Sequence, residues 1–168
     1  RQRSRAMSFI GLVPQELNFN QFEKPLDIVV NQAGYYGIPR EIALERAEKY
    51  LKQLQLWDKA HKWSRTLSGG MKRRLMIARA MVNEPKLLIL DEPTAVLTPQ
   101  EVSELLEILQ RLASEGKSIV FISHKLDEVI EASDRITVLR DGEVVDTVDT
   151  EDVDKHDLAR MMVGRDVL

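Results

Sequence analysis

The sequence predicts an α/β fold with a mainly parallel sheet, and three observations favour it. The run Lys86–Leu90 is short, apolar and closed by Asp91 and Glu92, which is typical of a strand buried on both faces of a parallel sheet. Ser118–Ser123 predicts a second buried strand. Between the two strands, apolar residues recur at helical spacing and predict a helix: Val102, Leu105, Leu106, Leu109 and Leu112.

Length and composition are those of a globular domain. The 168 residues are 43% hydrophobic and 30% charged, enough for one domain with a core of its own. Cysteine is absent, which removes disulfides and thiolate metal sites and fits a reducing compartment. No apolar run approaches the roughly 18 residues of a membrane span. The basic residues of Arg1–Arg5 precede no apolar segment of the kind a signal peptide needs, so we expect membrane contact only through a partner.

Charge is unevenly distributed. Residues 1–84 hold 15 Lys and Arg against 8 Asp and Glu, whereas residues 85–168 hold 9 against 19. A nucleic-acid face is one interpretation of such asymmetry, but no regular interleaving of basic and aromatic residues supports it. We therefore expect no nucleic acid, interpret Trp57 and Trp63 as core or interface anchors, and place His61 on the surface.

The first half of the chain predicts one strand followed mostly by helices. Ser8–Val13 is the expected strand. Pro25 can start a helix through Leu26–Ala33, and periodic apolar residues predict another over Arg40–Leu56. The turn between these helices is expected at Gly34, Gly37 and Pro39.

Ser68-Gly69-Gly70 is expected to open a third helix. Ser68 is a good N-cap, and the glycines let an anion approach the free backbone N–H groups. One apolar face follows at helical spacing: Met71, Leu75, Ala78 and Val82. Asn83-Glu84-Pro85 stops this helix. The strand after it ends in Asp91 and Glu92, and ligands of parallel sheets bind at the carboxyl ends of strands. We therefore expect both acids to point into a site.

Beyond these acids the local patterns are equally definite. Thr98-Pro99-Gln100-Glu101 has the form of a capping box and begins a helix that ends near Gly116. The remaining elements expected are a helix over Lys125–Ala132, strands over Arg135–Leu139 and Glu143–Val148 joined by a turn at Asp141-Gly142, and a helix over Lys155–Val163 ended by Gly164.

Several of these segments together resemble the ATP-binding cassette (ABC) ATPases. Leu67–Met71 is similar to that family's LSGGQ signature, with Met in place of Gln, and Leu87–Glu92 is similar to its Walker B strand with the catalytic Glu. Ile10–Gln15 resembles the strand leading to the Q-loop. Ile122-Ser123-His124 resembles the segment of the switch histidine. Two such motifs in this order, about twenty residues apart, identify the chain as a member of the family.

The resemblance implies a partial RecA-like P-loop NTPase core with an inserted helical subdomain. The core would comprise residues 1–17 and 86–168, and the subdomain carrying the signature would comprise residues 18–85. It further implies a head-to-tail dimer with a second cassette, transmembrane permease subunits as partners, and a position on the cytoplasmic face of the inner membrane.

The family's functional residues carry over onto matching positions. Asp91 would hold Mg²⁺ through water, Glu92 would polarise the water that attacks ATP, and His124 would sense the γ-phosphate. Gln15 would reach the Mg²⁺ and water. The signature would bind ATP held by the opposite subunit through Ser68, Gly69 and Gly70. The family's D-loop usually has Asp at the position of Thr98, so any cross-dimer role of that carboxylate is in doubt.

The phosphate cradle G-x-x-x-x-G-K-[ST] of such ATPases is not found. Gly116-Lys117-Ser118 imitates its tail, but Arg111 stands where the first Gly is required. It also follows a helix and precedes a strand, so we interpret it as a helix C-cap with a Lys near the dipole's negative end. We expect an N-terminally truncated cassette that is inactive alone.

The resemblance is mixed along the chain. Residues 1–94 resemble ATPases of ABC-2-type exporters, whereas residues 95–168 resemble those of sugar or nucleoside importers. Two hypotheses stay open, a junction of two cassette types at the shared phrase Asp91–Ala95 or one natural protein with mixed features.

Three classes of function are compatible with these motifs. The favoured one is the ATPase subunit of a transporter. A soluble ABC protein of DNA repair would need a long coiled-coil insertion, and one of translation would pair two cassettes through a basic linker; neither feature is visible. A non-catalytic or engineered cassette fragment is the third.

Overall fold

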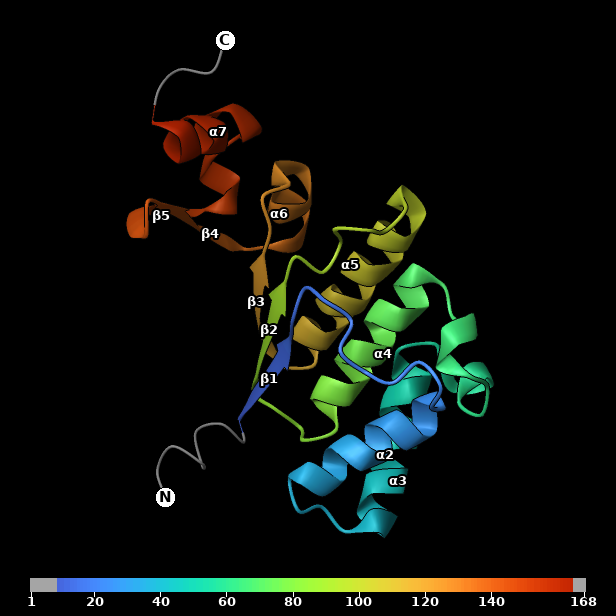
Figure 1. The fold of residues 1–168 in the computed structure, drawn as a ribbon. Coiled ribbons are helices and arrows are strands. Elements are labelled where there is room, and N and C mark those ends of the chain that lie inside the picture. Colours follow the sequence, from blue (N-terminus) through green and yellow to red (C-terminus); the bar gives the residue numbers. More distant parts are fainter. Residues whose placement is uncertain (1–8, 165–168) are drawn as a thin grey trace. The chain divides into compact units, whose positions relative to one another are not determined.

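The computed structural model describes residues 9–164, and its contacts divide the chain after Ile122 into two compact units. The elements of both units are labelled in Figure 1. This boundary differs from the division expected at residues 17/18 and 85/86, which stays a prediction. None of the helices in the described part of the chain is long and apolar enough to cross a membrane.

The first unit contains a three-stranded parallel sheet in the order β1-β2-β3. Its strands are β1 (Ile10–Val13), β2 (Leu87–Asp91) and β3 (Ser118–Ile122). Gly11 pairs with Leu88, and Leu88 pairs with Ile119. The three predicted strands and their parallel arrangement are therefore confirmed, apart from Ser8, which lies outside the described residues.

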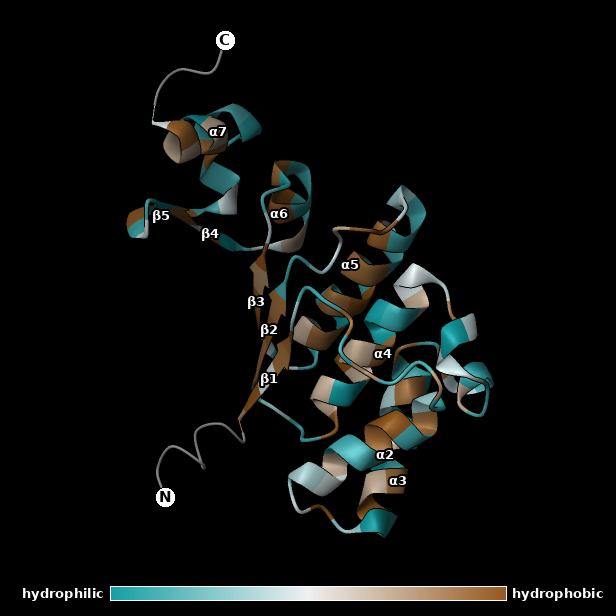
Figure 2. Ribbon diagram, viewed as in Figure 1, coloured by the Kyte–Doolittle hydropathy of each residue, from teal (hydrophilic) through white to brown (hydrophobic). Residues whose placement is uncertain are grey.

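The prediction that these strands are buried on both faces is wrong. Leu88 and Leu90 are buried, whereas Leu12 and Val120, which point to the other face, are 59% and 44% exposed. Helices α4 and α5 lie on the same side of the sheet (Figure 1). The strands are hydrophobic along their length (Figure 2), so an apolar run predicted the strands but could not reveal that one face stays partly exposed within residues 9–164.

Helix α4 (Gly69–Met81) is the central helix of the first unit. Nine of its thirteen residues are buried, because it packs against β1 and against helices α2, α3 and α5. Its backbone comes so close to β1 that a Cβ on Gly11 would lie 3.0 Å from the Ala80 carbonyl oxygen. The helix ends at Met81, and the predicted stop Asn83-Glu84-Pro85 follows it, with Glu84 at φ of 52°.

Two helices precede α4 in the sequence. They are α2 (Pro25–Tyr35) and α3 (Arg40–Gln53), and Pro25 occupies the first turn of α2. The expected turn begins later than predicted, because Gly34 is still helical and Gly37 adopts φ of 71°. Trp63 is 49% exposed, so it does not belong to the core. His61 is exposed as expected and packs edge-on against Trp57, with 6.1 Å between ring centroids.

Helix α5 (Pro99–Ser114) begins with the predicted capping box, since Thr98 accepts from the Glu101 N–H and Glu101 accepts from the Thr98 N–H. It buries Leu105, Leu106, Ile108, Leu109 and Leu112. Gly116, with φ of 88°, follows its C-terminus. Gly116 lies at the predicted C-cap, where its N–H donates to the Ala113 carbonyl and the Lys117 N–H donates to the Leu112 carbonyl. The Lys117 ammonium donates to the Pro85 carbonyl at 2.8 Å.

The second unit contains helices α6 (Leu126–Ala132) and α7 (Lys155–Val163) and an antiparallel pair, β4 (Arg135–Arg140) and β5 (Glu143–Asp149). Asp141 and Gly142 have φ of 53° and 82°, as a two-residue hairpin turn requires. A small core joins these elements around Ile136, Val138 and Leu158. The predicted elements of this region are confirmed.

Candidate functional site

The N-terminus of α4 presents the first group of expected site residues. Ser68 is the N-cap, with extended φ and ψ of −64° and 170°, and its Oγ accepts from the Met71 N–H at 3.2 Å. Gly69 and Ser68 are exposed, whereas Gly70 is buried. The first-turn N–H groups and the positive end of the helix dipole make this terminus suitable for an anion.

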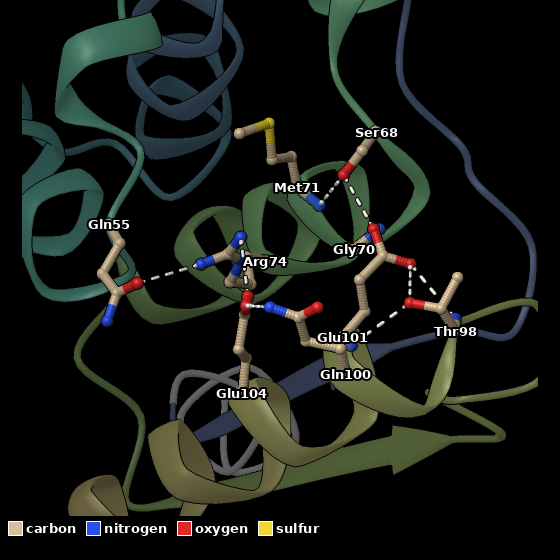
Figure 3. A network of polar contacts seen from close by, with 9 residues as sticks. All are labelled: Gln55, Ser68, Gly70, Met71, Arg74, Thr98, Gln100, Glu101 and Glu104. Atoms are coloured by element: carbon tan, nitrogen blue, oxygen red, sulfur yellow. Dashed lines mark hydrogen bonds and ion pairs between the residues drawn. The ribbon is translucent and has the colours of Figure 1, made fainter.

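One carboxylate of the same chain already contacts this terminus (Figure 3). Glu101 Oε1 accepts from the Ser68 hydroxyl at 2.9 Å and from the Gly70 N–H at 3.0 Å. Its Oε2 accepts from the N–H and the hydroxyl of Thr98 at 3.2 and 3.3 Å. The pKa of the Glu101 carboxyl is lowered by the hydrogen bonds from Ser68, then from the Thr98 and Gly70 N–H groups. A single side chain thus caps both α4 and α5.

The carboxyl end of the central strand presents the two expected acids. Asp91 is the last residue of β2, in register with Ile122, and Glu92 follows it. Glu92 adopts φ of 42°, and its N–H donates to the Ile122 carbonyl at 2.9 Å. Left-handed φ in a non-glycine residue costs about 1–3 kcal/mol and is common at functional sites. The sharp turn directs the chain away from the sheet immediately after β2.

Gln15 lies on the exposed segment after β1, and a buried arginine of α4 holds its backbone. Arg73 is 2% exposed. Its Nη1 donates to the Pro14 carbonyl at 2.7 Å, and its Nη2 donates to the Gln15 carbonyl at 2.6 Å. Burial lowers the pKa of Arg73, while the charge of Asp91 opposes that change. Arg73 therefore ties α4 to the backbone of the Gln15 segment. The negative charge of Asp91 acts on the same guanidinium.

His124 is the second residue of the second unit and is exposed. It lies between β3 and α6, where the Ser123 hydroxyl accepts from the Lys125 N–H at 3.1 Å. The structure thus brings together Ser68, Gly69 and Gly70 in one group and Asp91 and Glu92 in another. The roles expected for these residues, and for Gln15 and His124, stay predictions.

The donor set after β1 and β2 consists of oxygen atoms, from the Asp91 and Glu92 carboxylates and the Gln15 amide. Mg²⁺ prefers oxygen ligands and usually keeps several waters, so these side chains fit that ion. The N-terminus of α4 offers an N–H and a hydroxyl, which suit a phosphate oxygen. The chemistry available is therefore anion binding at α4 and carboxylate-assisted proton transfer after β2.

Sequence reasoning missed Arg73 and Glu101 as members of the site. Arg73 is not among the site residues that the sequence predicts, and Glu101 is predicted only as a member of the capping box of α5. Their contacts join residues 58–59 and 31–33 positions apart, a separation that local patterns do not encode. Arg73 is one of four basic residues in the sequence of α4, and nothing in the local pattern distinguishes it from Lys72, Arg74 and Arg79.

Comparison with known protein families finds one matching family, described as ABC transporter, over residues 1–95. Among curated relatives, a glucose import ATP-binding protein of Haloferax volcanii is 50% identical over 145 residues, covering 84% of this chain and 26% of the relative. A nucleoside import ATP-binding protein of Lactococcus lactis is 48% identical over 103 residues, covering 61% of this chain and 20% of the relative. The chain thus spans about a quarter or less of these relatives.

The alignment with the Haloferax protein is longer than either side of the junction expected at residues 94/95, so it crosses that junction. The hypothesis of two joined cassette types stays a prediction. Among solved structures, an inward-facing ABC transporter of the metal-chelate type matches with a TM-score of 0.83 at 27% identity. The match covers 92% of this chain and 64% of that one, and confirms the α/β fold of this ATPase class.

Proposed function

The chain belongs to the ABC transporter family, and we propose that it supplies the signature and Walker B parts of an ATPase site that drives transport. One observation carries the proposal. The first unit holds both a helix terminus whose groups suit an anion, at Ser68-Gly69-Gly70, and two acids at the end of the central strand, Asp91 and Glu92. Arg73 of the same helix donates to the Gln15 carbonyl, and its pKa is influenced by the charge of Asp91.

Each acid has a distinct proposed role. Glu92 accepts a proton from the water whose oxygen attacks the γ-phosphorus, while the bond to the leaving ADP breaks and ADP keeps the electron pair. A positioned general base of this kind contributes roughly 10²–10⁴ in rate. Asp91, with Gln15, would hold Mg²⁺ largely through water, and that ion would neutralise charge on the phosphate oxygens. For His124, contact with the γ-phosphate rests on the family motif alone.

Binding of the nucleotide's phosphates needs a further element, the phosphate cradle. The sequence contains no G-x-x-x-x-G-K-[ST] cradle, so we propose that the cradle is supplied from outside these 168 residues. In this arrangement Ser68, Gly69 and Gly70 donate to the γ-phosphate of ATP held by a second, head-to-tail cassette. Loss of even one preorganised donor costs about a hundredfold or more in rate, so the chain alone should show no measurable turnover.

The relatives suggest the setting of this activity. The curated matches are import ATP-binding proteins for glucose and nucleosides, which favours import of a sugar or a nucleoside. Membrane permease subunits would then be the partners, on the cytoplasmic face of the membrane. A non-catalytic cassette fragment is the second candidate.

Calorimetric titration with Mg·ATP tests the proposal. The 168-residue chain alone should show no saturable binding and no hydrolysis. The same chain joined to an N-terminal segment that carries a G-x-x-x-x-G-K-[ST] cradle should bind and hydrolyse ATP. Micromolar binding by the chain alone would mean that another group replaces the cradle, and an inert joined chain would favour the non-catalytic fragment.

A further inference from the structure

The donors proposed to bind phosphate at the N-terminus of α4 are already engaged by an anion of the same chain. The Ser68 hydroxyl and the Gly70 N–H both donate to Oε1 of Glu101, at 2.9 and 3.0 Å. Figure 3 shows this carboxylate lying over the first turn of α4, with its second oxygen directed at Thr98. The anion-binding terminus is therefore occupied in the isolated chain.

We propose that the Glu101 carboxylate is a built-in competitor, which a phosphate group must displace before the signature can bind it. This inference rests on the proposed function, since it concerns the same Ser68 and Gly70 donors. It adds a regulatory residue that lies on α5, outside the signature. Phosphate affinity at α4 is then set partly by how firmly this side chain is held.

The Glu101 carboxylate and a phosphate cannot occupy the N-terminus of α4 together. Two anions that require the same N–H and hydroxyl repel each other, and a hydroxyl hydrogen can point to only one acceptor. The helix terminus favours one negative charge at a time, through the same positive end of the dipole. The binding of phosphate to Ser68 and Gly70 thus requires the carboxylate to withdraw.

Gly70 is fitted to the internal carboxylate. A Cβ at this position would lie 2.9 Å from both Cδ and Oε1 of Glu101, whereas a Cβ at Gly69 would meet its nearest atom, on Leu97, at 3.7 Å. The lack of a side chain at Gly70 is therefore what admits Glu101 to the helix terminus. The anion that approaches the Gly70 N–H in this structure is the Glu101 carboxylate of the same chain.

Thr98 can hold the Glu101 carboxylate after it withdraws from α4. Its second oxygen remains bonded to the N–H and hydroxyl of Thr98 in the capping box of α5. Thr98 ends the loop that follows Glu92, so one side chain links the phosphate donors of α4 to the loop after the acids. Displacement of Glu101 from α4 would then change the hydrogen bonds that hold Thr98 at the end of that loop.

The test is a titration of the 168-residue chain with inorganic phosphate at constant ionic strength, followed by NMR at the Gly70 and Met71 amides. Glu101→Gln removes the competing charge and should bind phosphate roughly tenfold more tightly than the wild type, the size expected for relief of a charge-assisted contact. Glu107→Gln is the matched control. Glu107 lies on α5 and is exposed, and its side chain makes no hydrogen bond or ion pair within residues 9–164. The phosphate affinity of Glu107→Gln should therefore equal that of the wild type.

A second variant protects the test against misfolding. Glu101→Asp keeps the charge and an acid at the third helical position, but its shorter side chain withdraws from α4. It should bind phosphate more tightly than the wild type and less tightly than Glu101→Gln. Thermal unfolding of each variant verifies the fold; if Glu101→Gln does not fold, the comparison of Glu101→Asp with the wild type decides.

The outcomes separate this inference from the proposed function. Equal phosphate affinity in wild type and Glu101 variants overturns the competition and leaves the signature as a phosphate site. Weaker binding by the variants also overturns it, and makes Glu101 a positioning residue. If phosphate shifts neither amide in any folded variant, the signature contact of the proposed function fails and the competition falls with it.

Discussion

Arg73 is the residue on which the Gln15 segment most depends. Its guanidinium is buried and donates to two carbonyls, at 2.7 and 2.6 Å. Arg73→Met leaves both carbonyls without this donor, so the free energy of unfolding should fall by about 1–3 kcal/mol. Arg73→Lys keeps the charge but lacks the planar fork, so it should restore only part of the loss. Chemical denaturation measures both changes.

A local measurement separates positioning from general stability. In both Arg73 variants, hydrogen exchange of residues 15–18 should rise more than exchange in the middle of α4. Lys72→Met is the matched control, because the side-chain contact of Lys72 within residues 9–164 is a long one, to Gln21 at 3.4 Å. Unchanged exchange in residues 15–18 of a folded Arg73→Met variant would refute the positioning role.

Glu101 gives the first unit a defined dependence on pH. The pKa of its carboxyl is lowered from the ordinary value of 4.5, first by the Ser68 hydroxyl and then by the Thr98 and Gly70 N–H groups. A lowered pKa in the folded state means that the stabilisation is fully present above about pH 4.5 and is lost as pH falls through the folded-state pKa. The difference in urea midpoint between wild type and Glu101→Gln should therefore shrink on acidification; a constant difference between pH 7 and pH 3 would contradict this.

Residues differ in how far their roles follow from sequence. Ser68 could be predicted as a cap and Asp91 as the end of a strand, because each depends on its immediate neighbours. The partners of Arg73 and Glu101 could not, because they lie 58–59 and 31–33 positions away. A folded chain is needed to show that the two helix termini share one carboxylate.

At the scale of the element, the N-terminus of α4 depends on the missing side chain of Gly70. An exposed Gly→Ala change inside a helix normally stabilises by about 0.5–1 kcal/mol. Gly70→Ala should not, because its Cβ would lie 2.9 Å from Glu101 Cδ and would expel the carboxylate. Gly69→Ala, with 3.7 Å of room, is the control and should be neutral or stabilising in thermal unfolding.

A double-mutant comparison makes this prediction specific. In a Glu101→Ala background the obstacle is gone, so Gly70→Ala should become neutral or stabilising. The coupling between the two changes then measures the contact itself. Equal effects of Gly70→Ala in both backgrounds would show that the carboxylate does not limit this position.

The bounds of helices and strands could be predicted where the sequence carries capping or turn residues. The capping box at Thr98 and the turn at Asp141-Gly142 fixed the starts and ends of their elements, and both are confirmed. Burial of the sheet was not predictable, because it depends on what packs against each face. Apolar runs in β2 and β3 looked the same whether one face or both are covered, and only Leu88 and Leu90 of β2 are buried.

At the scale of the whole molecule, the two compact units should respond separately to core damage. Leu158 is 1% exposed and packs in the small core of the second unit. Leu158→Ala should lower the local stability of that unit by about 2–5 kcal/mol. Hydrogen exchange should accelerate in β4, β5 and α7, while protection in α4 stays near its wild-type level. Equal acceleration in both units would show that they unfold together.

Glu92 is proposed to activate water in an ATPase site that includes the end of β2. ATP turnover tests this role in the chain joined to an N-terminal segment that carries a G-x-x-x-x-G-K-[ST] cradle, with Glu92→Gln beside Glu107→Gln as control. We expect Glu92→Gln to retain Mg·ATP binding and to lose roughly 10²–10⁴ in turnover, whereas Glu107→Gln changes neither. Turnover unchanged by Glu92→Gln, with binding intact, would contradict the assignment.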